Sequence, residues 1–235
     1  MNSRSAQGAQ LHVFLLLGQS NMAGRGRMDE VPPLRDERVW MFRNDQWQPA
    51  EEPLHNDKPD RAGVGLGMSF AMAVVEHGVA PVGLVPCAVG GTRLEQWLPG
   101  AERYTHAIRT AREALKSGVL RGILWHQGEA DAHALQEAST YGDRLTEMIH
   151  AIRADLNAGQ VPFLAGELGR FLRDHPGADY FEVVNQQLWT LPDRLENVGV
   201  VSAEGLGDNG DTLHFNAGSL REFGRRYAQV FLEMR

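Results

Sequence analysis

The sequence is poor in cysteine, and its charge is shifted toward acid. Cys87 is the one cysteine among 235 residues, so no disulfide can form within the chain. It lies in the apolar run "GLVPCAV" with no histidine beside it, and we interpret it as a small buried side chain rather than a catalytic thiol. Lys and Arg number 23 against 30 Asp and Glu, a formal net charge of −7. This balance disfavours nucleic acid and anionic membrane surfaces as partners.

Long hydrophobic runs are also missing near the N-terminus. The run "VFLLL" is far shorter than the roughly 18 apolar residues that cross a bilayer. The first ten residues, "MNSRSAQGAQ", are polar and lack the apolar segment of a secretory signal, so residues 1–10 are expected to be a disordered tail. We therefore expect a cytoplasmic protein, or a secreted one only if a signal peptide has been removed.

The length and the patterning predict one α/β domain over residues 1–235. Five short runs rich in Val, Leu and Ile show little polar alternation, which is typical of strands buried on both faces of a parallel sheet. They are 11–17, 80–89, 120–126, 161–168 and 197–204. Between and after them, apolar residues recur at helical spacing, so we expect helices on both faces of a five-stranded sheet. The segment 25–63 is a polar excursion with one short strand-like piece, "RVWMF".

Polar and glycine-rich segments follow four of the five predicted strands. They are "GQSN" after the first, "GGTR" after the second, "QGE" after the third and "GLGDNGDTLHFN" after the fifth. Ligands of open α/β sheets bind beyond the carboxyl ends of the strands. The sequence therefore predicts a site at this edge of the sheet.

Ser20 is the candidate nucleophile, because it comes where the first strand passes into a turn. A serine attacks a carbonyl only when a base removes its proton and donors stabilise the oxyanion. Residues 18–22 read Gly-Gln-Ser-Asn-Met, so this is not the G-x-S-x-G elbow of α/β-hydrolases. A different arrangement of serine and base is needed.

His214 is the strongest candidate for the base. It stands three residues after Asp211 in "DTLHFN", and a D-x-x-H turn lets the carboxylate reach Nδ1 while Nε2 faces a serine. An aspartate that merely caps a turn beside an exposed histidine is the alternative. The close spacing of His126, Glu129, Asp131 and His133 could suggest a metal, but neither H-E-x-x-H nor H-x-x-E-H occurs, so we predict no metal and no other cofactor.

Four segments occur in an order that resembles the SGNH hydrolase superfamily. They are "LGQSNMAG", "VGGTRLEQW", "WHQGEAD" and "DTLHFN", and they span nearly the whole chain. Within that superfamily they are similar to the sialate O-acetylesterase and acetylxylan esterase group, carbohydrate esterase family six and its relatives. The resemblance implies a flavodoxin-like, three-layer α/β/α fold.

The resemblance also implies the roles of individual residues. Ser20 matches the nucleophile, His214 the base and Asp211 the acid, with Glu129 as an alternative acid. The backbone N–H groups of Ser20 and Gly90 and the side chain of Gln127 match the oxyanion donors, and Gly91 is the alternative to Gly90.

The function implied by the resemblance is that of a serine esterase that removes acetyl groups from a sugar or another small acetyl ester. Trp97 could stack on a sugar face or could simply pack in the core. The alternatives are a lipid or thioester acylhydrolase of the same fold and a carbohydrate-binding module without catalysis. The polar character of segment 25–63 disfavours the first, and the intact candidate residues disfavour the second. The oligomeric state stays open.

Overall fold

The computed structural model describes residues 10–235, so nearly all of the expected tail at 1–10 lies outside the described residues. One sheet contains seven strands in the order β3-β2-β4-β1-β5-β6-β7. The strands are β1 (Leu11–Gly18), β2 (Val39–Arg43), β3 (Gln46–Pro49), β4 (Val82–Pro86), β5 (Gly118–His126), β6 (Phe163–Gly166) and β7 (Val198–Val201). All neighbouring pairs are parallel except β2 and β3.

The predicted count of five strands is wrong by two, and both additions lie in the polar excursion. Strand β2 is the "RVWMF" piece, which pairs in parallel with β4. Strand β3 has the polar sequence Gln-Trp-Gln-Pro and no buried position, as an edge strand does. A two-residue turn joins them, and both of its residues, Asn44 and Asp45, have positive φ (53° and 56°), as a type I′ hairpin turn requires.

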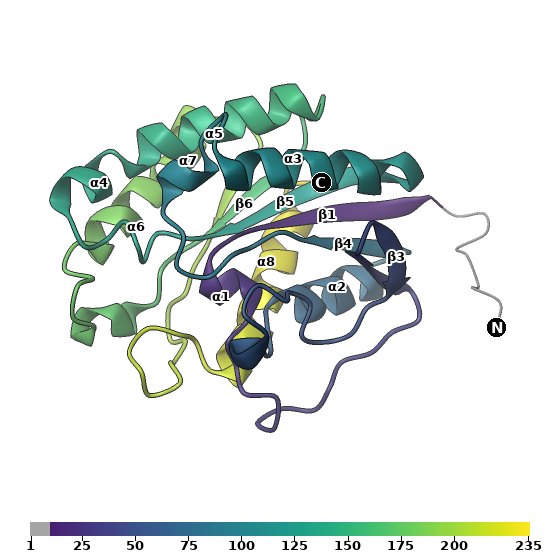
Figure 1. The fold of residues 1–235 in the computed structure, drawn as a ribbon, viewed down its shortest axis with the longest axis horizontal. Coiled ribbons are helices and arrows are strands. Elements are labelled where there is room, and N and C mark those ends of the chain that lie inside the picture. Colours follow the sequence, from purple (N-terminus) through teal and green to yellow (C-terminus); the bar gives the residue numbers. More distant parts are fainter. Residues whose placement is uncertain (1–9) are drawn as a thin grey trace.

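Helices cover both faces of the sheet (Figure 1), which confirms the three-layer prediction. Helices α3 (Glu102–Ala114) and α5 (Tyr141–Asp155) lie on one face with the shorter α4 (Leu135–Ser139), α6 (Phe181–Trp189) and α7 (Leu191–Arg194). Helices α2 (Gly67–Glu76) and α8 (Ala217–Glu233) pack together on the other face. The short helix α1 (Ser20–Ala23) follows β1.

Strand β1 divides the hydrophobic core because its side chains alternate between the two faces of the sheet. Val13, Leu15 and Leu17 belong to the cluster under α3 and α5. Phe14 and Leu16, which point the other way, belong to the cluster under α2 and α8. Burial on both faces is the reason that β1 has no polar alternation in its sequence.

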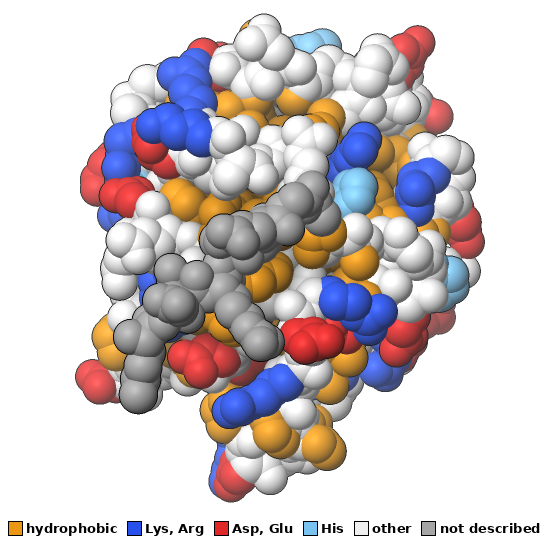
Figure 2. Space-filling model, turned by 90° about the vertical axis from the view of Figure 1, so that its right-hand side faces the viewer, with side chains coloured by type: hydrophobic (Ala, Val, Ile, Leu, Met, Phe, Trp, Pro, Cys, Tyr) orange, Lys and Arg blue, Asp and Glu red, His pale blue; other side chains and the backbone are white. Residues whose placement is uncertain are grey.

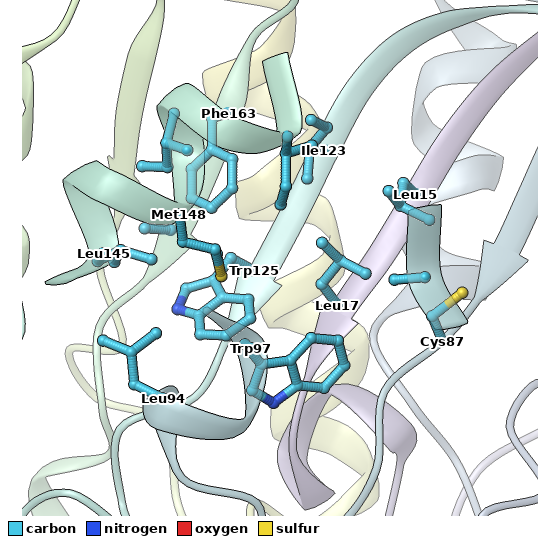
Figure 3. Close-up of a cluster of buried hydrophobic side chains, with 14 of the residues drawn as sticks. Leu15, Leu17, Cys87, Leu94, Trp97, Ile123, Trp125, Leu145, Met148 and Phe163 are labelled. Carbon is cyan, nitrogen blue, oxygen red and sulfur yellow. The ribbon is translucent and has the colours of Figure 1, made fainter. Parts of the chain in front are cut away.

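Cys87 belongs to the first of these clusters (Figure 3). Burial raises the pKa of its thiol to about 12, which keeps it protonated and unreactive as a nucleophile at neutral pH.

The surface that faces the viewer in Figure 2 carries charges of both signs, with hydrophobic side chains between them. Among residues 10–235, no helix is both long and apolar enough to cross a membrane. Within the same residues, no group of three or more His, Cys, Asp or Glu side chains is arranged to hold a metal ion.

Candidate active site

Ser20 lies at the carboxyl edge of the sheet because the chain turns sharply after β1. Gly18 has a φ of +130°, and a Cβ at this position would lie 2.0 Å from the carbonyl oxygen of His126. Only glycine therefore allows β1 to pass so close to the end of β5. The next residue, Gln19, donates its N–H to the same carbonyl at 2.9 Å, and Ser20 then begins α1.

The loop before α8 brings His214 to Ser20. His214 Nε2 lies 3.1 Å from Ser20 Oγ, and His214 Nδ1 lies 2.6 Å from Asp211 Oδ2. The other carboxylate oxygen, Asp211 Oδ1, accepts the backbone N–H groups of Leu213 (2.9 Å) and His214 (2.8 Å). The structure thus brings together the three residues that the sequence pattern singles out, in the order serine, histidine, aspartate.

The environment of Asp211 favours its charged form. Burial alone would raise the pKa of Asp211, but the backbone N–H groups of His214 and Leu213 and the imidazole of His214 outweigh this, so the pKa is lowered. An ionised carboxylate at Nδ1 keeps the proton on that nitrogen and leaves Nε2 free to accept one.

Asn21 holds the histidine loop from both sides. Its Nδ2 donates to the carbonyl of Leu213 at 3.1 Å, and its Oδ1 accepts the N–H of Phe215 at 3.1 Å. The same Nδ2 donates to Glu129 Oε1 at 2.5 Å. The amide of Asn21 therefore fixes the two neighbours of His214 while it is itself fixed by Glu129.

Glu129, the alternative acid, contacts this support rather than His214. It is buried, and its Oε1 lies 3.3 Å from Nε2 of the buried His126. Burial opposes ionisation, but His126 and the hydrogen bond from Asn21 lower the pKa of Glu129 overall. The structure therefore places an ionised carboxylate behind Asn21 and a second one, Asp211, directly on His214.

The Gly90 N–H, an expected oxyanion donor, is engaged elsewhere in this structure. It donates to Asp57 Oδ2 at 2.7 Å, and Arg25 Nη2 donates to the same oxygen at 2.7 Å. A Cβ on Gly90 would lie 2.6 Å from Arg25 Nη2 and 3.4 Å from Ser20 Cβ, so Gly90 is packed between the nucleophile and this ion pair. The alternative donor, Gly91, lines the same cavity as Ser20.

The side chain of Gln127 is also engaged within the protein. It is fully buried, and its Nε2 donates to Asp131 Oδ2 (2.7 Å), the Thr92 carbonyl (3.0 Å) and Gln19 Oε1 (3.2 Å). Its Oε1 accepts the hydroxyl of Tyr141 at 2.9 Å. The structure thus uses Gln127 to join the segments after β1, β4 and β5, and it differs from the expected arrangement in which this amide faces the acyl oxygen.

Trp97 is buried in the core, and the structure corrects the idea that it stacks on a sugar. Only 1% of its surface is exposed, its ring packs edge-on against Trp125 at 5.6 Å, and its Nε1 donates to Thr92 Oγ1 at 3.0 Å (Figure 3). Trp97 therefore packs in the core: it ends the short 3-10 helix Leu94–Trp97, and its side chain belongs to the buried cluster under α3 and α5.

A cavity of about 260 Å³ opens around Ser20 and His214. Gln19, Gly90, Gly91, Glu129 and Leu213 are among the residues that line it, together with the basic residues Arg25, Lys58, Arg61 and His175. Arg25 is neutralised by Asp57, whereas Lys58 and Arg61 are exposed and form no ion pair with any residue in 10–235. The cavity therefore offers positive charge next to the candidate nucleophile.

Sequence reasoning missed Asn21, Asp57 and Arg25. Asn21 and Arg25 lie close to Ser20 in the sequence, but nothing local shows that their partners are about 190 and 32 residues away. Asp57 lies in the excursion 25–63, whose length was the one available sign of a functional loop.

Comparison with known proteins identifies the family of the chain. Residues 10–233 match the family model "Carbohydrate esterase, sialic acid-specific acetylesterase". A probable carbohydrate esterase of Arabidopsis thaliana is 33% identical over 241 residues, which cover 94% of this chain and 90% of the relative. An X-ray structure of that Arabidopsis protein has a TM-score of 0.88, 32% identity and coverage of 96% of this chain and 99% of that one.

Two more distant solved structures share the fold. NanS has a TM-score of 0.77 at 16% identity and covers 95% of this chain and 97% of its own. A carbohydrate acetylesterase from Xanthomonas citri has a TM-score of 0.70 at 20% identity over 93% of this chain and 55% of its own. With the family match over residues 10–233 and the Arabidopsis relative, these findings show that the chain belongs to the sialic acid-specific acetylesterase family of carbohydrate esterases and is a carboxylic ester hydrolase.

Proposed function

We propose that the chain removes acetyl groups from acetylated sugars through an acetyl-enzyme on Ser20. The observation that carries the proposal is the hydrogen-bonded series Ser20 Oγ–His214 Nε2 (3.1 Å) and His214 Nδ1–Asp211 Oδ2 (2.6 Å) at the edge of an open cavity. A serine, a base and an orienting carboxylate in this order form the arrangement that activates serine for acyl transfer.

In the first half of the reaction, Ser20 Oγ attacks the acetyl carbonyl and His214 Nε2 takes the serine proton. His214 then gives this proton to the sugar oxygen as the C–O bond of the ester breaks, which leaves an acetyl group on Ser20. In the second half, water attacks the acetyl carbonyl while His214 Nε2 takes a proton from it. His214 then returns this proton to Ser20 Oγ as the bond between the acetyl carbon and Oγ breaks, and acetate leaves. Asp211 stays ionised and holds the imidazole throughout.

The oxyanion of each tetrahedral intermediate needs donors close to Ser20. The N–H of Ser20 belongs to the first turn of α1 and so has no partner within the helix, which makes it the first donor. The N–H of Gly90 is occupied by Asp57, so the N–H of Gly91, which lines the same cavity as Ser20, is the second donor, on the loop that Asp57 and Arg25 hold.

The exposed Lys58 and Arg61 favour an acetylated sugar that also carries a carboxylate, because opposite charge attracts the substrate to the cavity. The same charges disfavour long acyl chains, which would need an apolar groove. A lipid acylhydrolase is therefore less consistent with this cavity than an acetylesterase.

The test is acetate release from acetylated sialic acid, acetylated xylan and simple acetylated monosaccharides, together with hydrolysis of p-nitrophenyl acetate and octanoate. We expect the acetate ester to be hydrolysed faster than the octanoate ester, and the acidic sugar to be the best sugar substrate. Faster turnover of the octanoate ester would favour the acylhydrolase alternative. Failure to hydrolyse any ester would contradict the proposed chemistry.

A further inference from the structure

A second cavity, of about 400 Å³, lies beside the candidate active site at the carboxyl ends of β2 and β4. Its wall includes the end of β2 and the segment Pro86–Val89, and helix α3 contributes His106, Arg109 and Thr110. The segment Leu54–Asp57 completes it. Of the residues named in the proposed reaction, only Asp57 lines this cavity. The proposed reaction therefore gives the cavity no role.

The two cavities share a thin wall made of two chain segments. Asp57 and Val89 line the second cavity, whereas the next residue of each segment, Lys58 and Gly90, lines the cavity of Ser20. The hydrogen bond from Gly90 N–H to Asp57 Oδ2 joins the two segments across this wall. A molecule with one part at Ser20 can therefore place its neighbouring part over the wall and into the second cavity.

Several buried polar atoms of residues that line the second cavity have no hydrogen-bond partner within residues 10–235. They are Oδ1 of Asp57 and Oγ1 of Thr110, and neither ring nitrogen of His55 forms a well-aligned hydrogen bond, although the Leu16 carbonyl is close enough to act on the ring. His55 is 3% exposed and the side chain of Asp57 is also 3% exposed. Buried polar groups are nearly always paired, so this concentration at one cavity indicates that a polar molecule completes it.

The chemistry of these groups selects hydroxyl-bearing ligands. Burial lowers the pKa of His55 to about 4, so at neutral pH its ring offers one donor and one acceptor. Thr110 also donates and accepts, and Asp57 accepts. Sugar hydroxyls both donate and accept, and the apolar sides of Phe42 and Ala88 in the same wall suit the C–H face of a pyranose.

The charges at the rim do not select an ion. Arg109 Nη1 lies 3.9 Å from Asp45 Oδ1, and the third rim charge, Arg43, donates to the carbonyls of Pro53 (2.7 Å) and Leu54 (3.2 Å). An anionic ligand in the cavity would meet the Asp57 carboxylate, and an apolar ligand would leave the buried polar atoms unpaired.

We infer that this cavity binds a neutral sugar unit linked to the acetylated sugar, so that the enzyme acts on acetylated oligosaccharides in preference to acetylated monosaccharides. The inference rests on the proposed function, since it assigns the second cavity to the part of the same substrate that carries no reacting acetyl group. His55, Thr110 and the rim residue Asn56 are the residues that recognise this unit.

The first experiment compares esters that differ only in chain length. These are mono-acetylated xylose against mono-acetylated xylotriose, and acetylated sialic acid against the same residue linked to lactose. In the wild type we expect the longer ester of a pair to have at least a tenfold higher kcat/KM. Thr110→Val should reduce this ratio about three- to tenfold, the loss expected for one hydrogen bond, and His55→Leu should reduce it by at least as much.

Two controls separate this inference from the proposed function. Hydrolysis of p-nitrophenyl acetate should stay within twofold of wild type in both variants, because this ester does not reach the second cavity. Thr105→Val changes an exposed threonine on the same helix outside the cavity and should leave the length ratio unchanged. The inference would be overturned if the ratio of kcat/KM for the longer ester to that for the shorter ester were near one in the wild type. It would also be overturned if this ratio were the same in the wild type and in both cavity variants.

If no sugar ester is hydrolysed, a binding measurement tests whether the second cavity binds a sugar. Unacetylated xylotriose is titrated into the wild type and into Thr110→Val by calorimetry, with p-nitrophenyl acetate activity as proof of an intact site. Binding at millimolar or lower concentration that Thr110→Val weakens supports the sugar cavity even though the proposed substrate is then wrong. No binding by the wild type would overturn the cavity assignment.

Discussion

The two sides of the catalytic cavity are built in different ways. On the histidine side, Asp211 and His214 are three residues apart, and their contact follows from one short turn. On the glycine side, Gly90 and Gln127 are held by groups that come from other parts of the chain, such as Asp57, which is 33 residues from Gly90. The first side presents its reactive atoms to the cavity, whereas the second uses the expected donors to hold the loops together.

A local motif such as D-x-x-H predicts well which two side chains are in contact. It predicts less well whether a hydrogen-bond donor is left free to face the substrate. The spacing of D-x-x-H limits how far the carboxylate can be from the imidazole, whatever the rest of the fold does. Whether a buried amide faces a substrate depends on every acceptor around it, and a buried amide must find partners somewhere. The following predictions test the two sides separately.

The largest effect is expected from Ser20→Ala. Removal of the nucleophile should lower kcat for acetyl esters by about 10³-fold or more, because only binding and oxyanion stabilisation remain. Stability should change little, since the hydroxyl makes its one side-chain contact to His214. The measurement is acetate release with a thermal melt of each protein, and Ser139→Ala, at an exposed serine, is the matched control. If Ser20→Ala keeps most of the wild-type kcat, another residue is the nucleophile.

The next largest effect is expected from a comparison of the two carboxylates. Asp211→Asn should lower kcat by roughly 10–10⁴-fold, because an amide at this place favours the wrong tautomer of His214. Glu129→Gln should lower it by less than tenfold, since a glutamine oxygen can still accept from Asn21 and His214 keeps its own carboxylate.

Both variants are measured on one acetyl ester, with folding checked by circular dichroism. A larger loss for Glu129→Gln in a folded protein would make Glu129 the acid and would reduce Asp211 to a residue that shapes the turn.

What can be predicted from the sequence follows from the same difference between local contacts and contacts that depend on tertiary packing. The five short apolar runs predict β1, β4, β5, β6 and β7, because strands buried on both faces must be apolar throughout. Strand β3 could not be predicted, since a polar edge strand leaves no such signal. For the site, the turn at Asp211 and His214 is local. The partners of Asn21 and Asp57 depend on tertiary packing, which the sequence does not display.

A moderate effect is expected from Gln127→Ala, and mainly on stability. The change leaves Asp131 Oδ2, the Thr92 carbonyl and Gln19 Oε1 without a shared buried donor, so we expect a loss of about 1–3 kcal/mol in unfolding free energy. The loosened loops should also lower kcat about tenfold. Urea denaturation and steady-state kinetics measure the two effects, and Gln186→Ala, at an exposed position, is the control. A large loss of kcat at unchanged stability would instead indicate that Gln127 acts on the oxyanion.

The smallest effect is expected from Asp57→Asn, and it is a dependence of stability on pH. Burial would raise the pKa of Asp57, but the hydrogen bonds from Arg25 and from the Gly90 N–H outweigh it and lower the pKa in the folded protein. A carboxyl whose pKa is lower in the folded state than in the unfolded state stabilises the fold above its unfolded pKa, near 4. This contribution disappears as the pH falls through the folded value, because the unfolded chain takes up the proton first.

Asparagine cannot titrate, so Asp57→Asn should melt about 2–4 °C below the wild type at pH 7, and the gap should narrow between pH 5 and pH 3. Thermal melts at pH 7, 5, 4 and 3 measure the gap, and Asp60→Asn, at an exposed aspartate of the same loop, is the control that should not show it. A gap that stays constant or widens toward acid would mean that Asp57 holds Gly90 by hydrogen bonding alone, without the charge. In that case the glycine side of the cavity would depend on shape rather than on the buried ion pair.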